Sequence, residues 1–209
     1  MLAAWYPGPL ETALIVTRIV VLVIAACLLI FLLFQFFRRR FALDFAPDEQ
    51  IDRNVTLFQE RTMQPLPNRA EYVHVRVRCV GRKSIANCAG WITSLERLDR
   101  GRTVAKLTGS RPLIWAPREQ GITHTNIQPG IPQDLDIFRT VENVNVLELL
   151  SVGHPQRWVT FFSVPGTYGL RIMVSGEGST KSIRLIVTWR GNWNNFDVVP
   201  KKSWAWPRL

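Results

Sequence analysis

A continuous apolar run near the N-terminus is the feature that most constrains what this chain can fold into. Residues 13–37 read ALIVTRIVVLVIAACLLIFLLFQFF, and the stretch from Ile19 to Phe34 is apolar throughout. About 20 helical residues cross the roughly 30 Å hydrocarbon core of a bilayer, so the run is long enough to span it. Arg18 lies near one end, where its long side chain reaches the interface. The sequence predicts a transmembrane helix over residues 13–37, preceded by a short non-cytoplasmic segment over residues 1–12.

The residues on either side of this run predict its orientation. Trp5 and Tyr6 precede it, and aromatic side chains of this kind are enriched at the membrane interface. Three arginines follow the run directly, namely Arg38, Arg39 and Arg40. Because basic flanks favour the cytoplasmic side, we expect a single-pass protein of the cell (inner) membrane, with its N-terminus outside and its main domain in the cytoplasm. A main domain on the extracytoplasmic side is the alternative.

A processing signal is a second interpretation of the same run. The tetrapeptide from Ile24 to Cys27 resembles a bacterial lipobox, in which the cysteine is lipidated and becomes the mature N-terminus. The mature chain would then begin with LLIFLLFQFF, where lipoproteins usually carry a polar tether. A cleaved signal peptide would need a basic n-region and a clear small-residue cleavage site. We therefore interpret the run as a spanning helix.

Alternation of apolar and polar residues predicts a β-rich domain after the helix. Between Tyr72 and Cys79 three valines point one way, whereas His74, Arg76 and Arg78 point the other way. Similar short segments recur without a convincing amphipathic helix, and this pattern favours an antiparallel β-sandwich. We expect a juxtamembrane connector over residues 38–69, the sandwich over 70–191 and an aromatic, basic tail over 192–209. The predicted strands cover residues 72–79, 87–95, 103–107, 113–115, 135–141, 145–150, 158–164, 168–175 and 183–189, with loops at 64–68 and 117–132.

Two segments within this region carry a family resemblance. The segment VRVRCVGRKSIANC runs from Val75 to Cys88, and the segment PGTYGL contains Tyr168. The first resembles the opening strands of bacterial immunoglobulin-like modules of the CARDB type, although Cys79 stands where an Asn is common. The second is similar to a tyrosine corner, in which the Tyr hydroxyl bonds nearby backbone. Over about residues 70–190 the resemblance implies an immunoglobulin-like sandwich with a binding or scaffolding role and no catalytic residues.

Sequence motifs for catalysis, metal binding and phosphate binding are missing. No histidine has a second ligand at i+2 or i+4, and GxSxG, GxGxxG and GxxxxGK[ST] do not occur. Asp134 and Asp136 form a DxD pair able to hold a cation, but their apolar neighbours predict an ordinary half-buried strand. Cys79 and Cys88 are interpreted as two buried thiols, with a disulfide in an oxidising compartment as the alternative. We expect no enzyme, no cofactor and no metal.

The net charge of +10 falls on the part of the chain after the helix, because Arg18 and Glu11 cancel within the anchor. Beside a bilayer, a basic surface suits anionic lipid headgroups. Basic residues interleaved with aromatic ones also bind single-stranded nucleic acid, which we rank below lipid, and a merely solvated basic surface ranks above both. The candidate basic binding face consists of Arg76, Arg78, Arg82, Lys83, Arg171, Arg184 and Arg190.

The C-terminal tail carries large aromatic side chains in a polar context. We expect them to pack over an edge of the sandwich, which protects that edge from pairing with other chains. A docking peptide for another protein is the alternative. Taken with the anchor, these features predict a membrane-anchored, non-enzymatic binding or scaffolding module whose partners are the lipid bilayer and another protein. The alternatives are an accessory subunit of a larger membrane complex and an envelope-facing adhesion or sensor domain. The candidate docking residues are Trp193, Phe196, Trp204 and Trp206.

Overall fold

The chain divides into an N-terminal helix and a β domain. The computed structural model describes residues 8–37, 41–44, 46–58, 64–116, 121–153 and 156–201 of the 209-residue chain. It separates into two compact units whose boundary falls at residues 38–39. Of the six predicted membrane-interface residues, Arg18 belongs to the helix, whereas Trp5, Tyr6, Arg38, Arg39 and Arg40 lie outside the described residues.

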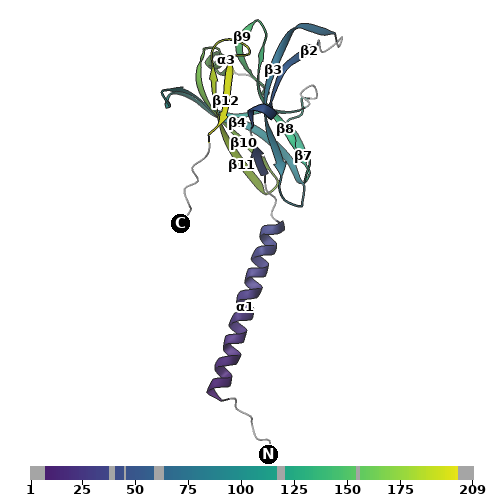
Figure 1. The fold of residues 1–209 in the computed structure, drawn as a ribbon, viewed down its shortest axis with the longest axis vertical. Helices are drawn as coiled ribbons and strands as arrows, with labels where there is room; N and C mark the ends of the chain where they lie inside the picture. Colours follow the sequence, from purple (N-terminus) through teal and green to yellow (C-terminus); the bar gives the residue numbers. More distant parts are fainter. Residues whose placement is uncertain are drawn as a thin grey trace, which may run out of the picture. The chain divides into compact units, whose positions relative to one another are not determined.

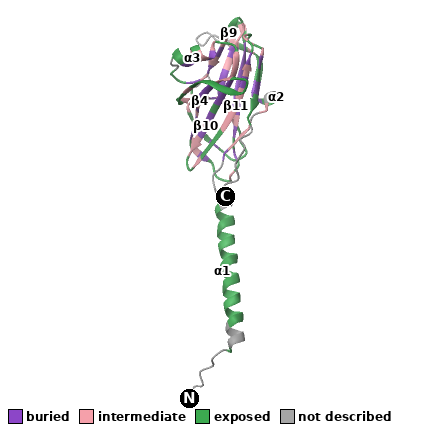
Figure 2. Ribbon diagram, turned by 90° about the vertical axis from the view of Figure 1, so that its left-hand side faces the viewer, coloured by how far each residue is buried: buried purple, intermediate pink, exposed green. Residues whose placement is uncertain are grey.

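The helix α1 extends from Pro9 to Phe37. It begins earlier than predicted because proline is tolerated in the first turn, where its missing N–H has no helical partner. Its segment Ala13–Phe34 is long and apolar enough to cross a membrane. The side chains of residues 13–34 are exposed (Figure 2). These observations confirm the predicted candidate span.

The β domain is a sandwich of two antiparallel sheets (Figure 1). In the first, sheet A, the long strand β3 lies beside β8. Strands β1 and β2 follow one another along the outer edge of β3, separated by the single turn α2, while β6 and β9 pair with the far edge of β8. The elements are β1 Phe41–Asp44, α2 Pro47–Gln50, β2 Ile51–Phe58, β3 Pro65–Cys79, β6 Ile114–Trp115, β8 Gln133–Val141 and β9 Val144–Leu149.

The second sheet, sheet B, has the order β12-β11-β10-β4-β5, with β7 paired to the first residues of β4. The short helix α3 connects β9 to β10. The elements are β4 Ile85–Asp99, β5 Arg102–Pro112, β7 His124–Ile127, α3 Gln156–Phe162, β10 Gly166–Gly176, β11 Ser179–Trp189 and β12 Phe196–Pro200.

The strand order is that of an immunoglobulin-like sandwich. In that fold strands B and E are neighbours in one sheet, and G, F and C are neighbours in the other. Here β3 and β8 take the places of B and E, and β11, β10 and β4 take the places of G, F and C. The structure therefore confirms the predicted fold class, a single apolar helix plus an immunoglobulin-like antiparallel β-sandwich.

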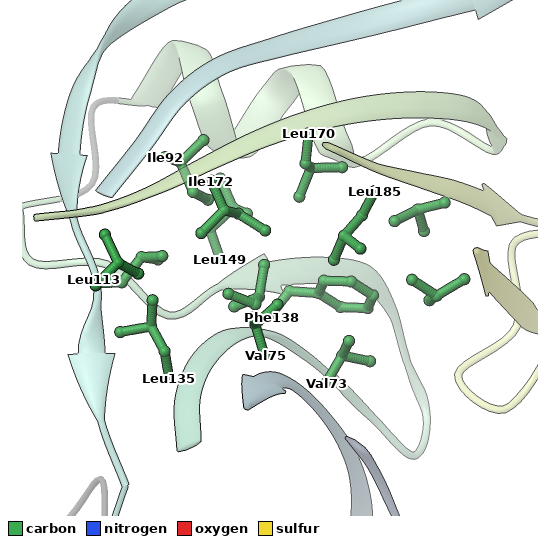
Figure 3. Packing of buried hydrophobic residues seen from close by; sticks show 14 of the residues in the cluster. Val73, Val75, Ile92, Leu113, Leu135, Phe138, Leu149, Leu170, Ile172 and Leu185 are labelled. Atoms are coloured by element: carbon green, nitrogen blue, oxygen red, sulfur yellow. The ribbon is translucent and has the colours of Figure 1, made fainter. Parts of the chain in front are cut away.

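The core lies between the two sheets and is made by the apolar side of each alternating strand. Figure 3 shows valines of β3 and residues of β8 facing residues of β4, β10 and β11. The aromatic rings of Phe138 and Phe196 meet edge to face with centroids 5.7 Å apart, which ties the last strand of sheet B to sheet A. Side chains with no exposed surface include Val73, Val75, Ile92, Leu135, Phe138, Leu170, Ile172 and Leu185.

A tyrosine corner closes the connection into β10, as the sequence predicted. The hydroxyl of Tyr168 donates a hydrogen bond to the carbonyl oxygen of Val164, four residues upstream. The Tyr168 ring stacks on Phe162 of α3 with centroids 4.7 Å apart. Burial raises the pKa of the Tyr168 phenol, although the nearby Arg97 guanidinium opposes the shift. The corner therefore fixes α3 against the end of sheet B.

Three predicted segments differ from the structure. Residues 158–164 do not form a strand, because Trp158 and Phe162 lie four residues apart and bury the same face of the short helix α3. The expected connector over 38–69 instead supplies β1, α2, β2 and the start of β3, including the expected loop at 64–68. The expected loop over 117–132 contains β7, although residues 117–120 lie outside the described residues. Backbone pairing with β3 and β4 gives these segments their strand conformation, although their sequences do not alternate regularly.

Candidate functional site

The seven residues of the predicted basic face do not form one continuous surface. Arg76 and Arg78 lie on β3 in sheet A, and Arg82 and Lys83 lie in the turn that follows. The other three belong to sheet B and the residue after it: Arg171 on β10, Arg184 on β11, and Arg190 directly after β11. Because the two sheets pack through their inner faces, cations on their outer faces point away from one another. The charge is therefore divided between two sides and one end of the sandwich.

Carboxylates compensate the cations of sheet A. Arg76 donates from Nη1 to Glu49 at 2.9 Å and from Nε to Asp134 at 3.2 Å. The hydrogen bond to Asp134 and the negative charge of that carboxylate raise the pKa of Arg76 above its usual value. Arg78 donates from Nε to Asp44 at 2.7 Å. Glu49 and Asp44 come from the segment expected to be a connector, which is why sequence reasoning missed these pairs.

A second ion cluster crosses three strands on the outer face of sheet B. Glu96 on β4 accepts from Arg184 on β11, although β10 lies between these strands. Gly169 of β10 makes this crossing feasible, since a Cβ there would lie 3.1 Å from Nη2 of Arg184. Lys106 on β5 approaches the other oxygen of Glu96 at 3.3 Å. An isolated glycine within a strand signals such a close approach, and this was the available sequence clue.

A histidine lies between two carboxylates on the outer face of sheet A. His74 is only 4% exposed, whereas the sequence predicted a solvated position. Its Nδ1 lies 3.9 Å from Asp52 of β2, and its Nε2 lies 3.7 Å from Asp134 of β8. Asp136, the second carboxylate of the DxD pair, is buried directly opposite His74 in the β3–β8 register. The imidazole thus connects three adjacent strands.

No metal centre is formed by the residues that the structure describes. Within those ranges, no group of three or more His, Cys, Asp or Glu side chains is placed to hold a metal ion. Asp134, which the sequence singled out as a candidate cation ligand, is engaged by Arg76 and His74 instead. His154 lies outside the described residues.

The two cysteines of the domain are buried free thiols, as predicted. Burial raises the pKa of Cys88 to about 11, so its reactive thiolate form is scarce at neutral pH. Cys79 ends β3, and its Sγ donates to the carbonyl oxygen of Lys83 at 3.1 Å. The Cys79 thiol therefore holds the turn that connects the two sheets.

The predicted docking tail is in part a strand of the sandwich. Residues 196–200 form β12 and pair with β11 in antiparallel register. Phe196 is buried in the core, and Trp193 is half-buried in the preceding turn. Within the described residues, these rings therefore cover the β11 edge of sheet B. Trp204 and Trp206 lie outside the described residues.

A two-stranded ribbon of sheet A extends beyond the end of β8. We define the β2–β3 ribbon as residues 56–58 of β2 and 64–69, the start of β3. Pairing between β3 and β8 ends at Ala70, whereas pairing between β3 and β2 continues to Pro65 opposite Phe58. Residues 64–67 are all exposed, and Leu66 keeps 41% of its surface in solvent. Figure 1 shows β2 and β3 running together away from the other strands, at the upper right.

The ribbon lies far from the point where the chain joins the sandwich. Phe41, the first described residue of the domain, pairs with Cys79 at the last residue of β3. At roughly 3.3 Å per residue, Pro65 at the first residue of β3 lies about 45 Å along the strand from Cys79 at its last residue. The two ends of the sandwich thus carry different surfaces.

No protein-family model matches the chain, and no curated protein matches it.

Proposed function

We propose that this chain is a membrane-tethered, non-catalytic binding module that holds an immunoglobulin-like sandwich at the cytoplasmic face of the membrane and presents it to a protein partner. The apolar helix over Ala13–Phe34 supports the tether, and the arginines at 38–40 favour this orientation. The resemblance to CARDB-type modules supports a binding role, since such sandwiches serve as recognition scaffolds.

The β2–β3 ribbon is the observation that carries the proposal. An isolated two-stranded ribbon is marginally stable at best in water, because neither face is covered. Here, Pro65 pairs on one side with Phe58 of β2, while β8 ends before reaching it. Pro65 and Pro67 supply no N–H, so a partner lying along this edge meets main-chain carbonyls and the exposed Leu66 side chain. The ribbon therefore suits recognition of an extended segment through these carbonyls and Leu66.

The ion pairs described above argue against the outer strand faces as the main recognition surface. Arg76, Arg78, Arg184 and Arg190 each contact a carboxylate of the same domain. An external anionic partner would have to compete with these carboxylates. The exposed side chain of Leu66 in the ribbon faces no such competition, because it is apolar.

Site-specific photo-crosslinking of the full chain in its own membrane tests this proposal. A photoreactive amino acid replaces Leu66, and the matched control replaces Val104, which is 59% exposed on the edge strand β5. We expect one discrete crosslinked protein at Leu66 that is absent at Val104. Equal crosslinking at both positions, or none at Leu66, would refute a ribbon-centred function. A stoichiometric complex that survives detergent extraction would identify the chain as an accessory subunit.

A further inference from the structure

Three turns meet at the Phe41 end of the sandwich, opposite the ribbon. The first, residues 80–84, follows β3, and the second, residues 128–132, precedes β8. A parallel bridge between Cys79 and Pro129 holds these two side by side. The third turn joins β10 to β11, and its Glu177 N–H donates to the carbonyl oxygen of Ala86 at 3.1 Å. We refer to these turns as the Phe41-end turns.

These turns expose apolar side chains that the core does not use. Val80 is 57% exposed and Ile131 is 51% exposed, and each belongs to one of the two bridged turns. Both side chains are β-branched and therefore stiff. The turns themselves are held by Cys79, whose thiol donates to Lys83, and by Ile131, whose N–H donates to Gln128 at 3.2 Å. Two rigid apolar side chains thus lie at one end of the domain.

Cations accompany these apolar side chains. Arg82 and Lys83 are exposed in the first turn, and Lys181 is exposed at the start of β11. The described residues 80–84, 128–132 and 177–181 contain one carboxylate, Glu177, against these three cations. Exposed apolar side chains flanked by cations match the interface of a bilayer, where apolar groups enter the headgroup boundary and cations attract anionic lipid.

The covalent chain brings this end close to the proposed tether. Three residues, all arginines, separate the last residue of α1 from Phe41. Four Cα steps extend no more than about 15 Å, whatever direction the helix takes. Phe41 itself pairs with Cys79, the residue directly before Val80. A bilayer crossed by α1 is therefore the surface that this end meets first.

We propose that the Phe41-end turns rest on the anionic headgroups of the bilayer, with Val80 and Ile131 at the headgroup–acyl boundary. The inference builds on the proposed membrane tether and adds a second attachment. This second attachment orients the sandwich with its Phe41 end toward the bilayer, so that the β2–β3 ribbon points away from the lipid. The cations of the turns favour anionic lipid, and the two apolar side chains determine how deeply the turns enter the bilayer.

Depth-dependent quenching in nanodiscs tests this attachment with the full chain. Single cysteines replace Val80 or Ile131 in a Cys27→Ser background, and an environment-sensitive fluorophore is attached while the buried Cys79 and Cys88 stay unlabelled. The matched control is Val144→Cys, an exposed valine that pairs with Val141 at the ribbon end of β8. Nanodiscs contain phosphatidylcholine alone or with phosphatidylglycerol, plus a nitroxide-labelled lipid as quencher.

We expect quenching at Val80→Cys and Ile131→Cys to exceed that at Val144→Cys by about threefold or more in anionic nanodiscs. Replacing Arg82 and Lys83 by glutamate should weaken the association of the turns with anionic lipid by at least about thirtyfold, because each lost cation removes about 1 kcal/mol. Quenching no stronger than at Val144→Cys, or equal quenching in neutral and anionic lipid, would overturn the proposal. If the chain is not held in nanodiscs at all, the tether itself fails. If it is held and Leu66 crosslinks a partner while positions 80 and 131 stay unquenched, only this second attachment fails.

Discussion

The tyrosine corner offers the sharpest test of the fold, because one atom can be removed while the ring remains. Tyr168→Phe deletes the hydroxyl that donates to Val164 and keeps the stacking of the ring on Phe162. A hydrogen bond of this kind contributes about 1 kcal/mol net, and an unsatisfied buried carbonyl adds up to about 3 kcal/mol. Val164 is 43% exposed, so water can replace the lost donor. We therefore expect a loss of about 1 kcal/mol.

The companion variant Tyr168→Leu separates the hydroxyl from the ring. It removes the hydrogen bond together with the ring contacts to Phe161 and Phe162. Replacing a large buried ring by a smaller side chain loses transfer free energy and leaves a cavity, so a loss of about 3 kcal/mol is expected. For a chain of this size, 1 kcal/mol corresponds to about 2–4 °C in Tm.

The assay is urea unfolding of the full chain in detergent micelles, followed by tryptophan fluorescence. The midpoint should fall for both variants, and the slope with urea should stay unchanged if the unfolded surface is the same. A Tyr168→Phe variant as unstable as Tyr168→Leu would show that the hydroxyl, not the ring, dominates. A Tyr168→Phe variant equal to the wild type would refute a stabilising corner.

Alkaline pH gives an independent measure of the same group. Burial raises the folded-state pKa of Tyr168 above the usual value of 10.0 for a tyrosine, and the Arg97 guanidinium opposes this shift. The folded state therefore holds its proton more tightly than the unfolded state, and this contribution is fully present below pH 10. It is lost as pH rises through the folded pKa. As pH rises above 10, the free energy of unfolding of the wild type should therefore fall more steeply than that of Tyr168→Phe.

Three further measurements follow from other buried positions. Cys88, with its pKa raised to about 11 by burial, should resist iodoacetamide in the native chain at pH 8 and react after unfolding, as read by mass spectrometry. Burial raises the pKa of Glu71 above 4.5 despite its contact with Arg53, so its contribution is fully present below pH 4.5 and is lost as pH rises through the folded value. Glu71→Gln should therefore flatten the fall in stability between acidic and neutral pH, and an unchanged profile would contradict this sign. Gly90→Ala places a Cβ 2.3 Å from Cδ2 of the buried Leu135, and overpacking should cost about 1–3 kcal/mol in urea unfolding.

Local patterns explain which elements could be predicted. The helix is recognised by apolarity alone, because a lipid-spanning segment needs no partner in the sequence. The strands β3, β10 and β11 place their core residues at alternate positions of the sequence, since one side of each strand faces the core. The tyrosine corner could be predicted from the sequence around Tyr168, because its hydrogen bond joins residues that are only four apart in the chain.

Segments whose conformation depends on a distant partner were misjudged. Strands β1 and β2 are short or mixed in polarity and do not alternate regularly, and they are held by backbone pairing with β3 and by burial of Phe41 and Ile51 in the core. The segment with Trp158 and Phe162 was expected to be a strand because aromatic and β-branched residues favour strands. It is a helix in the structure because these two rings enter the core on one helical face.

The sequence by itself determined the apolar helix, the immunoglobulin-like alternation and the excess of positive charge. Only the tertiary structure decided where that charge lies. Glu49, Asp44 and Glu96 are distant in sequence from the arginines that they neutralise, and no local pattern reveals such pairs. The gathering of Val80 and Ile131 at one end, and of the ribbon at the other, likewise follows from strand register. Register is set by long-range pairing and core burial, which a linear pattern does not contain.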